Sequence, residues 1–349
     1  MDYNSQLFQS NPPPVRYQLS SCVWELTRRC NMSCAHCGSN AGLARNRELT
    51  LEEALSIANQ LLELGCQRVT LIGGEITLCR WWVEVALYLT NHGAVCDIVT
   101  NGYGKTAQDV EDIVKSRIAS VSISVDGYGS SHNRIRGKED AFSQLETFCA
   151  RVRPTGIPLT AVTTLTHPCL SDLDSLCQWL SEQGIVVWQW QQVSPMGRAA
   201  DKRDLCLTPD DVAWVLEKYL SLKERLPILL ADNLGYYYRS KSGEIVHPFF
   251  GCGAGLCVVG LDSEGNVRGC QSLYDERFIE GNLRVRSLRD IWLDPESFSY
   301  NRQFKPSDLT GKCKSCAYGN ICAGGCRSYN AFHDSLYCNL NCAAGFCQP

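Results

Sequence analysis

The feature that most constrains the fold of this chain is a regular alternation of strand-length and helix-length segments. Short apolar segments typical of β-strands alternate with segments whose apolar residues recur at helical spacing. The predicted strands cover residues 21–27, 68–72, 95–100, 120–125, 159–165 and 185–191. The predicted helices begin at the capping box Thr50-x-x-Glu53 and then cover 81–91, 107–116, 141–152, 170–183 and 208–225. Such βα units predict a parallel sheet, and six of them suit an α/β fold with a partial (β/α)6 TIM-like barrel.

The motifs that carry chemistry all follow predicted strands. In a barrel of this kind the reactive groups lie at the C-terminal ends of the strands, so these motifs are expected to meet at one site. They are the loop Cys30-x3-Cys34-x2-Cys37, then Gly73-Gly74-Glu75, Asn101-Gly102, Ser122-x-Ser124-x-Asp126-Gly127 and Pro195-Met196-Gly197.

The cysteine loop predicts an inorganic cluster. A loop can wrap Cys30, Cys34 and Cys37 around one small group, and cysteine thiolates hold iron–sulfur clusters. Three ligands leave one iron of a 4Fe–4S cluster open to a non-protein ligand. This favours a catalytic cluster over an electron-carrying one.

The 21 cysteines of the 349-residue chain are not expected to form disulfides. The N-terminus lacks the features of a signal peptide, and no apolar run of about 18 residues could span a membrane. A cytoplasmic protein keeps its thiols reduced. The net charge of −4 gives no reason to expect nucleic acid or an anionic membrane as partner. Eight scattered cysteines are interpreted as ordinary buried thiols: Cys22, Cys66, Cys79, Cys96, Cys149, Cys169, Cys177 and Cys206.

A second domain follows the barrel. From Phe249 onward the sequence is rich in glycine and cysteine, which predicts a loop-rich domain held together by metal. We expect an N-terminal arm over 1–18, the barrel over 19–235 and this domain over 236–349. Its strongest pattern is Cys313-x2-Cys316-x5-Cys322-x3-Cys326. Because C-x2-C is also a zinc spacing, a pair of structural zinc sites is an alternative.

The cysteine loop and the strand-end motifs together resemble the radical S-adenosylmethionine (SAM) superfamily. The resemblance implies that SAM binds the open iron and is cleaved to a 5′-deoxyadenosyl radical when the cluster is reduced. It implies that Gly73, Gly74 and Glu75 bind the SAM amino group, although Ile76 stands where a proline is usual. The segment with Ser124, Asp126 and Arg136 would bind the SAM carboxylate, and the backbone around Val193 would contact the adenine.

The C-terminal cysteines resemble the SPASM domain, which carries two auxiliary 4Fe–4S clusters and brings the expected total to three. The resemblance implies interleaved ligation. The first auxiliary cluster would take Cys252, Cys270 and Cys326, with Cys257 as the fourth ligand. The second would take Cys313, Cys316, Cys322 and one of the tail residues Cys338, Cys342 and Cys347. We choose Cys342, because relatives commonly end in a pattern close to Leu340-Asn341-Cys342.

This resemblance, from Cys22 to Cys342, implies an enzyme that modifies a ribosomally made precursor peptide. One subgroup, the spliceases, excises a tyramine unit and leaves an α-keto-β-amino amide. An arm too short for a leader-binding domain favours this subgroup, which uses a separate small leader-recognition protein; an external electron donor is also expected. Alternatives are C–S or C–C cross-linking, epimerisation, or oxidation like that of sulfatase maturases. Gln271 argues against the last, because those enzymes place an aspartate after the cysteine equivalent to Cys270.

Two non-catalytic classes stay open, namely an iron–sulfur electron carrier and a zinc-stabilised binding module. Several aromatic residues could line a peptide groove, although core packing is their more common role. They are Trp188, Trp190 and the run Tyr236-Tyr237-Tyr238. His36 in the cysteine loop is expected to pack or form hydrogen bonds rather than to bind a metal.

Overall fold

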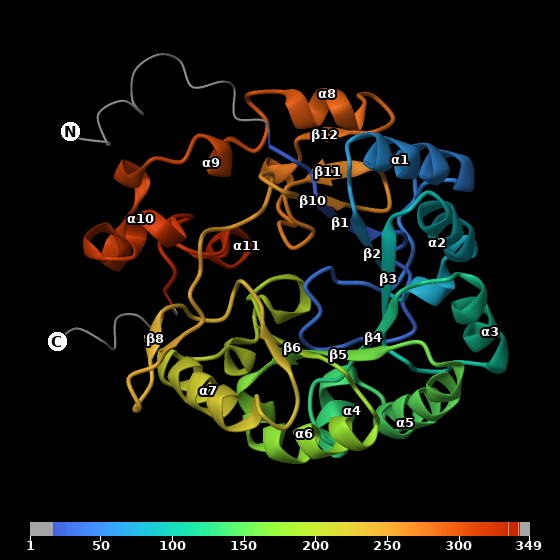
Figure 1. Cartoon of the computed structure of the whole chain (residues 1–349), viewed down its shortest axis with the longest axis horizontal. Coiled ribbons are helices and arrows are strands. Elements are labelled where there is room, and N and C mark those ends of the chain that lie inside the picture. The colour runs from blue at the N-terminus through green and yellow to red at the C-terminus, as the bar shows by residue number, and fades with distance from the viewer. Residues whose placement is uncertain (1–16, 334, 341, 343–349) are drawn as a thin grey trace, which may run out of the picture.

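A computed structural model describes residues 17–333, 335–340 and 342 of the chain. Most of the predicted N-terminal arm, and Cys347, lie outside these residues. Figure 1 shows a curved row of strands with helices α1 to α7 on its outer side. The segments after residue 249 lie mainly against the end of the row that contains β1.

Within the described residues, the main sheet contains ten strands in the order β12-β11-β10-β1-β2-β3-β4-β5-β6-β7, and β8 and β9 form a separate two-stranded sheet. Strands β1 to β7 pair in parallel with their neighbours, which confirms the partial barrel with its strand–helix alternation. The strands are β1 Ser21–Glu25, β2 Arg68–Ile72, β3 Val95–Thr100, β4 Ser120–Ser124, β5 Leu159–Leu165, β6 Trp188–Gln192, β7 Ile228–Leu230, β8 Tyr238–Arg239, β9 Ile245–Val246, β10 Val258–Leu261, β11 Asn266–Arg268 and β12 Gly281–Asn282.

The helices of the barrel occupy the predicted positions, with one addition. They are α1 Leu51–Glu63, α2 Trp82–Asn91, α3 Ala107–Lys115, α4 Ser130–Arg136, α5 Ala141–Val152, α6 Leu173–Glu182 and α7 Pro209–Leu222. Helices α8 Leu288–Leu293, α9 Ser299–Arg302, α10 Gly319–Cys322 and α11 Arg327–Asn330 belong to the C-terminal region. The addition is α4, which runs between two glycines with positive φ, Gly129 at 54° and Gly137 at 70°. This short helix carries Arg136 into the site.

The first helix shows how local sequence positions an element. The hydroxyl of Thr50 accepts a hydrogen bond from the Glu53 amide at 3.3 Å, and the Glu53 carboxylate accepts one from the Thr50 amide at 2.8 Å. This is the predicted capping box. The guanidinium of Arg284 also donates to both oxygens of Glu53, at 2.6 and 2.8 Å. The N-terminus of α1 is therefore tied to the C-terminal region.

The C-terminal region extends the barrel sheet. Strand β10 pairs in parallel with β1, in a register that matches Ser21 with Val258 and Trp24 with Leu261. The second domain expected from the change in composition is thus continuous with the barrel sheet at this edge, and the boundary near residue 235 stays a prediction. Within the described part of the chain, no helix is both long enough and apolar enough to cross a membrane.

Candidate active site

The cysteine loop follows β1 and is held by the segment after β6. Arg198 donates from Nε to the carbonyl of Cys34 at 2.8 Å and from Nη1 to the carbonyl of Ala41 at 2.7 Å, while its amide donates to the carbonyl of Cys37 at 3.0 Å. The loop packs so closely that a Cβ on Gly197 would lie 2.4 Å from the Cys37 carbonyl oxygen. Arg198 is a site residue that sequence reasoning missed. The one available signal was a basic residue directly after Pro-Met-Gly.

Hydrogen-bond donors approach each of the three loop sulfurs. Nη1 of Arg136 lies 3.7 Å from Sγ of Cys34, Nδ2 of Asn101 lies 3.9 Å from Sγ of Cys30, and the Ala41 amide lies 3.5 Å from Sγ of Cys37. Burial raises the pKa of the Cys30 thiol to about 11. Iron binding would displace such protons, and the donors would stabilise the resulting thiolates. These residues therefore fit a cluster held by Cys30, Cys34 and Cys37.

Gly73 and Gly74 pack closely against the loop after β1. A Cβ on Gly74 would lie 2.5 Å from the carbonyl oxygens of both Arg28 and Arg29. The amide of Gly74 donates to the Thr27 carbonyl at 2.7 Å. The close approach that requires glycine is made by the loop after β1, so chain packing alone accounts for these residues. Binding of a ligand by their backbone stays a prediction.

The carboxylate of Glu75 is buried, and most of its capacity to accept hydrogen bonds is occupied. Its Oε1 accepts hydrogen bonds from Thr100 at 2.7 Å and Thr77 at 3.2 Å and lies 3.0 Å from Nζ of Lys105. Its Oε2 accepts one, from the Asn101 amide at 2.8 Å. Because a carboxylate oxygen offers two lone pairs, Oε2 is the atom that keeps capacity for the ammonium group of a ligand. Lys105 neutralises the charge of Glu75 and so limits its attraction for that ligand.

The carboxylate of Asp126 contacts both Arg136 and His36 of the cysteine loop. Its Oδ2 lies 2.6 Å from Nη2 of Arg136 and 2.8 Å from Nε2 of His36, and its Oδ1 accepts from the Thr164 amide at 2.9 Å. Although burial opposes ionisation, Arg136 and His36 hold the pKa of Asp126 well below its usual range. Asp126 therefore orients Arg136 beside Cys34. Ser124 ends β4 and is half-buried, on the barrel-facing side of that strand.

The barrel interior is lined by polar side chains on β4, β5 and β6. Along β5 the fully buried residues pack on the outer helices, so the alternate, half-buried residues face inward. Ser122 and Thr160 are hydrogen-bonded at 2.5 Å, and Gln191 donates to Thr164 at 3.1 Å. The parallel register places Gln189 on the same face. Trp188 and Trp190 lie on the opposite face of the sheet, which packs against the helices. Tyr236, Tyr237 and Tyr238 are also buried in apolar clusters. These aromatic residues therefore pack in the core, which was the alternative to lining a peptide groove.

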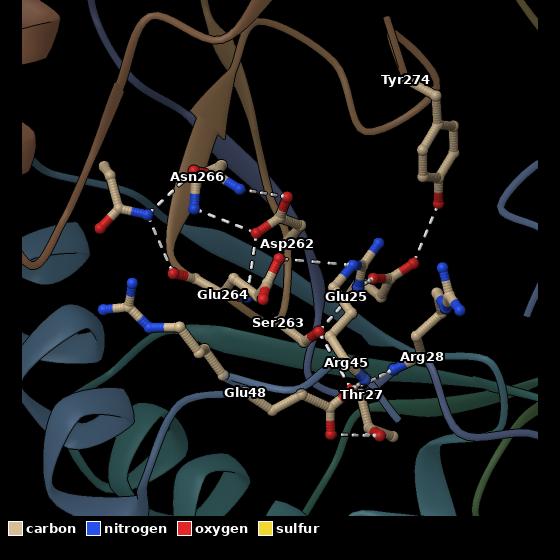
Figure 2. A network of polar contacts seen from close by, with 12 residues as sticks. Glu25, Thr27, Arg28, Arg45, Glu48, Asp262, Ser263, Glu264, Asn266 and Tyr274 are labelled. Atoms are coloured by element: carbon tan, nitrogen blue, oxygen red, sulfur yellow. Dashed lines mark hydrogen bonds and ion pairs between the residues drawn. The ribbon is translucent and has the colours of Figure 1, made fainter. Parts of the chain in front are cut away.

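A further polar network joins the end of β1 to the C-terminal region (Figure 2). The carboxylate of Glu25 is completely buried, accepts from the phenol of Tyr274 at 3.0 Å and pairs with Arg45. Arg45 also donates to the hydroxyl of Ser263 at 2.7 Å. Burial raises the pKa of Glu25. Glu48 completes the network through the Arg28 amide at 2.7 Å, so the start of the cysteine loop and the β10–β11 hairpin are held together.

The C-terminal cysteines form two groups. In the first, the Cys252 and Cys326 thiols are hydrogen-bonded, and Cys270 and Cys257 lie within electrostatic range of Cys252. The hydrogen bond from Cys326 lowers the pKa of Cys252 below its usual value. The chain thus brings together the residues predicted to hold the first auxiliary cluster, whose ligation stays a prediction.

In the second group, Cys313 packs in one apolar cluster with Cys338, and Cys322 packs in another with Cys342. Cys342 is also near enough to raise the pKa of Cys313, and Cys316 is near enough to raise that of Cys322. The structure places two tail cysteines next to this group. Among the described residues, no three or more His, Cys, Asp or Glu side chains are arranged to hold a single metal ion. A 4Fe–4S cluster is larger than one ion, and its four thiolates stand around it.

Two family models match the chain. The model of the radical SAM superfamily matches residues 24–180, and the model of the SPASM iron–sulfur cluster-binding domain matches residues 252–317.

Related proteins match most of the chain. An AdoMet-dependent heme synthase of Methanosarcina barkeri is 30% identical and is covered over 93% of its length by 90% of this chain. The mycofactocin maturase MftC of Mycolicibacterium smegmatis is 26% identical, with 78% of its length and 89% of this chain covered. The crystal structure of Streptococcus suis SuiB bound to S-adenosylmethionine has a TM-score of 0.74 at 17% identity, covering 92% of this chain and 76% of SuiB. SuiB has also been solved with its precursor peptide SuiA.

Proposed function

This chain belongs to the radical SAM superfamily, carries a SPASM domain and is an enzyme, and we propose that its substrate is a ribosomally made precursor peptide. We further propose three 4Fe–4S clusters and SAM as cofactors. When bound, the reduced barrel cluster and SAM supply a 5′-deoxyadenosyl radical that abstracts a hydrogen atom from the substrate. MftC is a maturase, and SuiB binds a precursor peptide, which supports a peptide substrate.

The observation that carries the proposal is the polar lining of the barrel. The inward face of β4 to β6 offers hydroxyl and amide groups, including Ser122, Thr160, Thr164 and Gln191. Such groups can exchange hydrogen bonds with the amides of a peptide, whereas the faces of a porphyrin ring offer few partners for them. The polar face lies on the barrel wall, next to the residues that surround the cysteine loop.

The chain's own residues would then prepare the site. Arg198 and Asn101 fix the cysteine loop, and Asp126 orients Arg136 beside Cys34. Oε2 of Glu75 is the acceptor available to the SAM ammonium group, and the guanidinium of Arg136 suits its carboxylate. Placement of the reacting C–H group by the surrounding wall is the main contribution expected of the protein in such a reaction.

For the reaction itself we propose backbone splicing, in which a tyramine unit leaves and an α-keto-β-amino amide remains. A separate small protein would bind the leader and deliver the core peptide. Reconstituted enzyme should be incubated with the short peptides encoded beside its gene, with and without a neighbouring small protein, and the products weighed by mass spectrometry. Splicing should lower the mass of the peptide by that of a tyrosine residue without its carbonyl group. A loss of two hydrogens would instead indicate cross-linking, and deuterium uptake alone would indicate epimerisation.

A porphyrin substrate is the second candidate. It is favoured by the 30% identity to a heme synthase over nearly the full length of both chains. Haem formation from a porphyrin precursor, with no change in any peptide, would establish it and overturn the peptide proposal.

A further inference from the structure

Gln271 presents a buried amide group that forms no hydrogen bond of normal geometry with the protein. The side chain is 4% exposed, and neither Oε1 nor Nε2 has a partner at normal hydrogen-bond geometry among the described residues. A buried amide without partners costs free energy, so such a group calls for an explanation. Replacing it with an apolar side chain of equal shape would remove that cost.

The backbone of Gln271 lies on the barrel-facing side of the sheet. Along β1, Cys22 and Trp24 are packed in the core against the outer helices, so Val23 faces inward. Val23 is paired in register with Gly260 of β10. A Cβ on Gly260 would lie 2.3 Å from the amide nitrogen of Gln271, so the backbone of Gln271 occupies the inward side of this strand.

The surroundings connect Gln271 to both cysteine systems. It directly follows Cys270, which the resemblance to the SPASM domain predicts as a ligand of the first auxiliary cluster. The phenol of Tyr274 donates to Glu25 at 3.0 Å, and its oxygen lies close enough to Gln271 and to Ser39 for weak hydrogen bonds with both. The hydroxyl of Ser39 lies 3.5 Å from Sγ of Cys37. Gln271 therefore stands beside the barrel interior, between the cysteine loop and the C-terminal cysteines.

We propose that Gln271 binds the substrate main chain, by hydrogen bonds to the N–H and C=O of one residue in an extended segment. This inference rests on the proposed peptide substrate. In an extended chain the N–H and C=O of one residue point to the same side, and antiparallel strands exchange both bonds through such pairs. The Gln271 amide offers one donor and one acceptor in the same arrangement. The glutamine thereby fixes the substrate backbone opposite the polar face of β4 to β6.

The test measures peptide binding to the reconstituted, SAM-loaded enzyme under anaerobic conditions by NMR titration. The probe is a blocked pentapeptide of alanines around one tyrosine, and a second probe is the same peptide N-methylated at every backbone amide. Gln271→Met keeps the length of the side chain and removes both polar atoms. Gln178→Met, on the exposed side of α6, is the matched control. We expect Gln271→Met to weaken binding of the first peptide about tenfold, because two hydrogen bonds are lost, and to weaken binding of the N-methylated peptide only about threefold, because that peptide keeps its carbonyl acceptors but has no N–H donors.

Thermal melting separates this role from a structural one. If Gln271 is paired only when substrate is bound, Gln271→Met should melt at or above the melting temperature of the native enzyme, because the substitution removes an unpaired buried amide. A lower melting temperature, or equal binding of the first peptide by the native enzyme and Gln271→Met, overturns the inference. If the native enzyme binds haem but neither peptide, the proposed function fails and the inference fails with it.

Discussion

The ammonium group of Lys105 lies 3.0 Å from Oε1 of Glu75, and the two side chains are only 3% and 0% exposed. Lys105 also donates to the hydroxyl of Thr77 at 2.8 Å. The pair is connected to the cysteine loop through Asn101, whose amide binds Glu75 and whose side chain donates to Asn31 at 2.8 Å. A buried charge pair connected to the cysteine loop thus has a structural role of its own.

Replacing Lys105 with methionine should lower the free energy of unfolding by about 3 kcal/mol, because Glu75 would remain as an unpaired buried charge. Combining Lys105→Met with Glu75→Gln should recover much of the lost free energy of unfolding. The control is Lys218→Met, which removes the partly buried partner of the exposed Asp174 and should cost less than about 1 kcal/mol. Urea denaturation under anaerobic conditions measures all three. Equal effects of the two lysine substitutions would show that the Lys105–Glu75 pair contributes little.

Arg198→Lys should loosen the barrel cluster without unfolding the protein. Lysine keeps the charge but cannot place donors on the carbonyls of Cys34 and Ala41 at once, which the guanidinium of Arg198 does. We expect faster iron loss in air and less 5′-deoxyadenosine per chain. Arg203→Lys on the exposed surface is the control. Unchanged iron retention in Arg198→Lys would contradict the role of this clamp.

The fold could be predicted from sequence where local signals agree with packing. Strands β2, β3 and β5 begin and end where their apolar runs do, and α1 begins at its capping box. The signal failed where an element depends on distant partners. Strand β7 is three residues long and forms by pairing with β6, and β10 is an edge of the barrel sheet because it pairs with β1. Neither pairing is visible in local periodicity.

His132 should make the protein sensitive to acid. Burial, and then the charge of Arg136, lower the pKa of His132 to about 3, well below its usual value near 6.5. Between these values the unfolded chain binds a proton that the folded chain does not, so stability falls as the pH drops from about 6.5 toward 3. At pH 5 this loss is about 2 kcal/mol.

His132→Asn should remove this loss, because asparagine does not titrate and can still accept from the Asp126 amide, which now donates to Nδ1 of His132 at 3.2 Å. The measurement is the change in unfolding free energy between pH 7.5 and 5.0. His167→Asn, at an exposed site, should keep the acid sensitivity of the native protein. The same loss in His132→Asn as in the native protein would exclude His132 as its source.

The sequence could predict only those residues of the candidate site whose type and spacing indicate a chemical role. The three loop cysteines, Glu75 and Arg136 stand out by spacing and strand-end position, and the structure brings Arg136 to Cys34. Sequence could not show that Glu75 is paired with Lys105 or that Gly74 packs against the loop after β1. Those contacts join residues that are far apart in the chain, and neither Lys105 nor the loop backbone that Gly74 contacts belongs to a recognisable motif.

Iron content should identify the tail ligand of the second auxiliary cluster. Cys342 packs with Cys322 and is near enough to Cys313 to raise the pKa of that thiol, whereas Cys338 packs with Cys313. A ligand must reach the centre of its group, so Cys342 is the better placed of the two. Cys342→Ser should lower the iron of the reconstituted protein from about twelve to about eight atoms per chain, since each 4Fe–4S cluster holds four. Cys338→Ser and the control Cys206→Ser should keep about twelve. Iron loss in Cys338→Ser but not in Cys342→Ser would reverse the assignment, and full iron in both would mean that neither residue is the ligand.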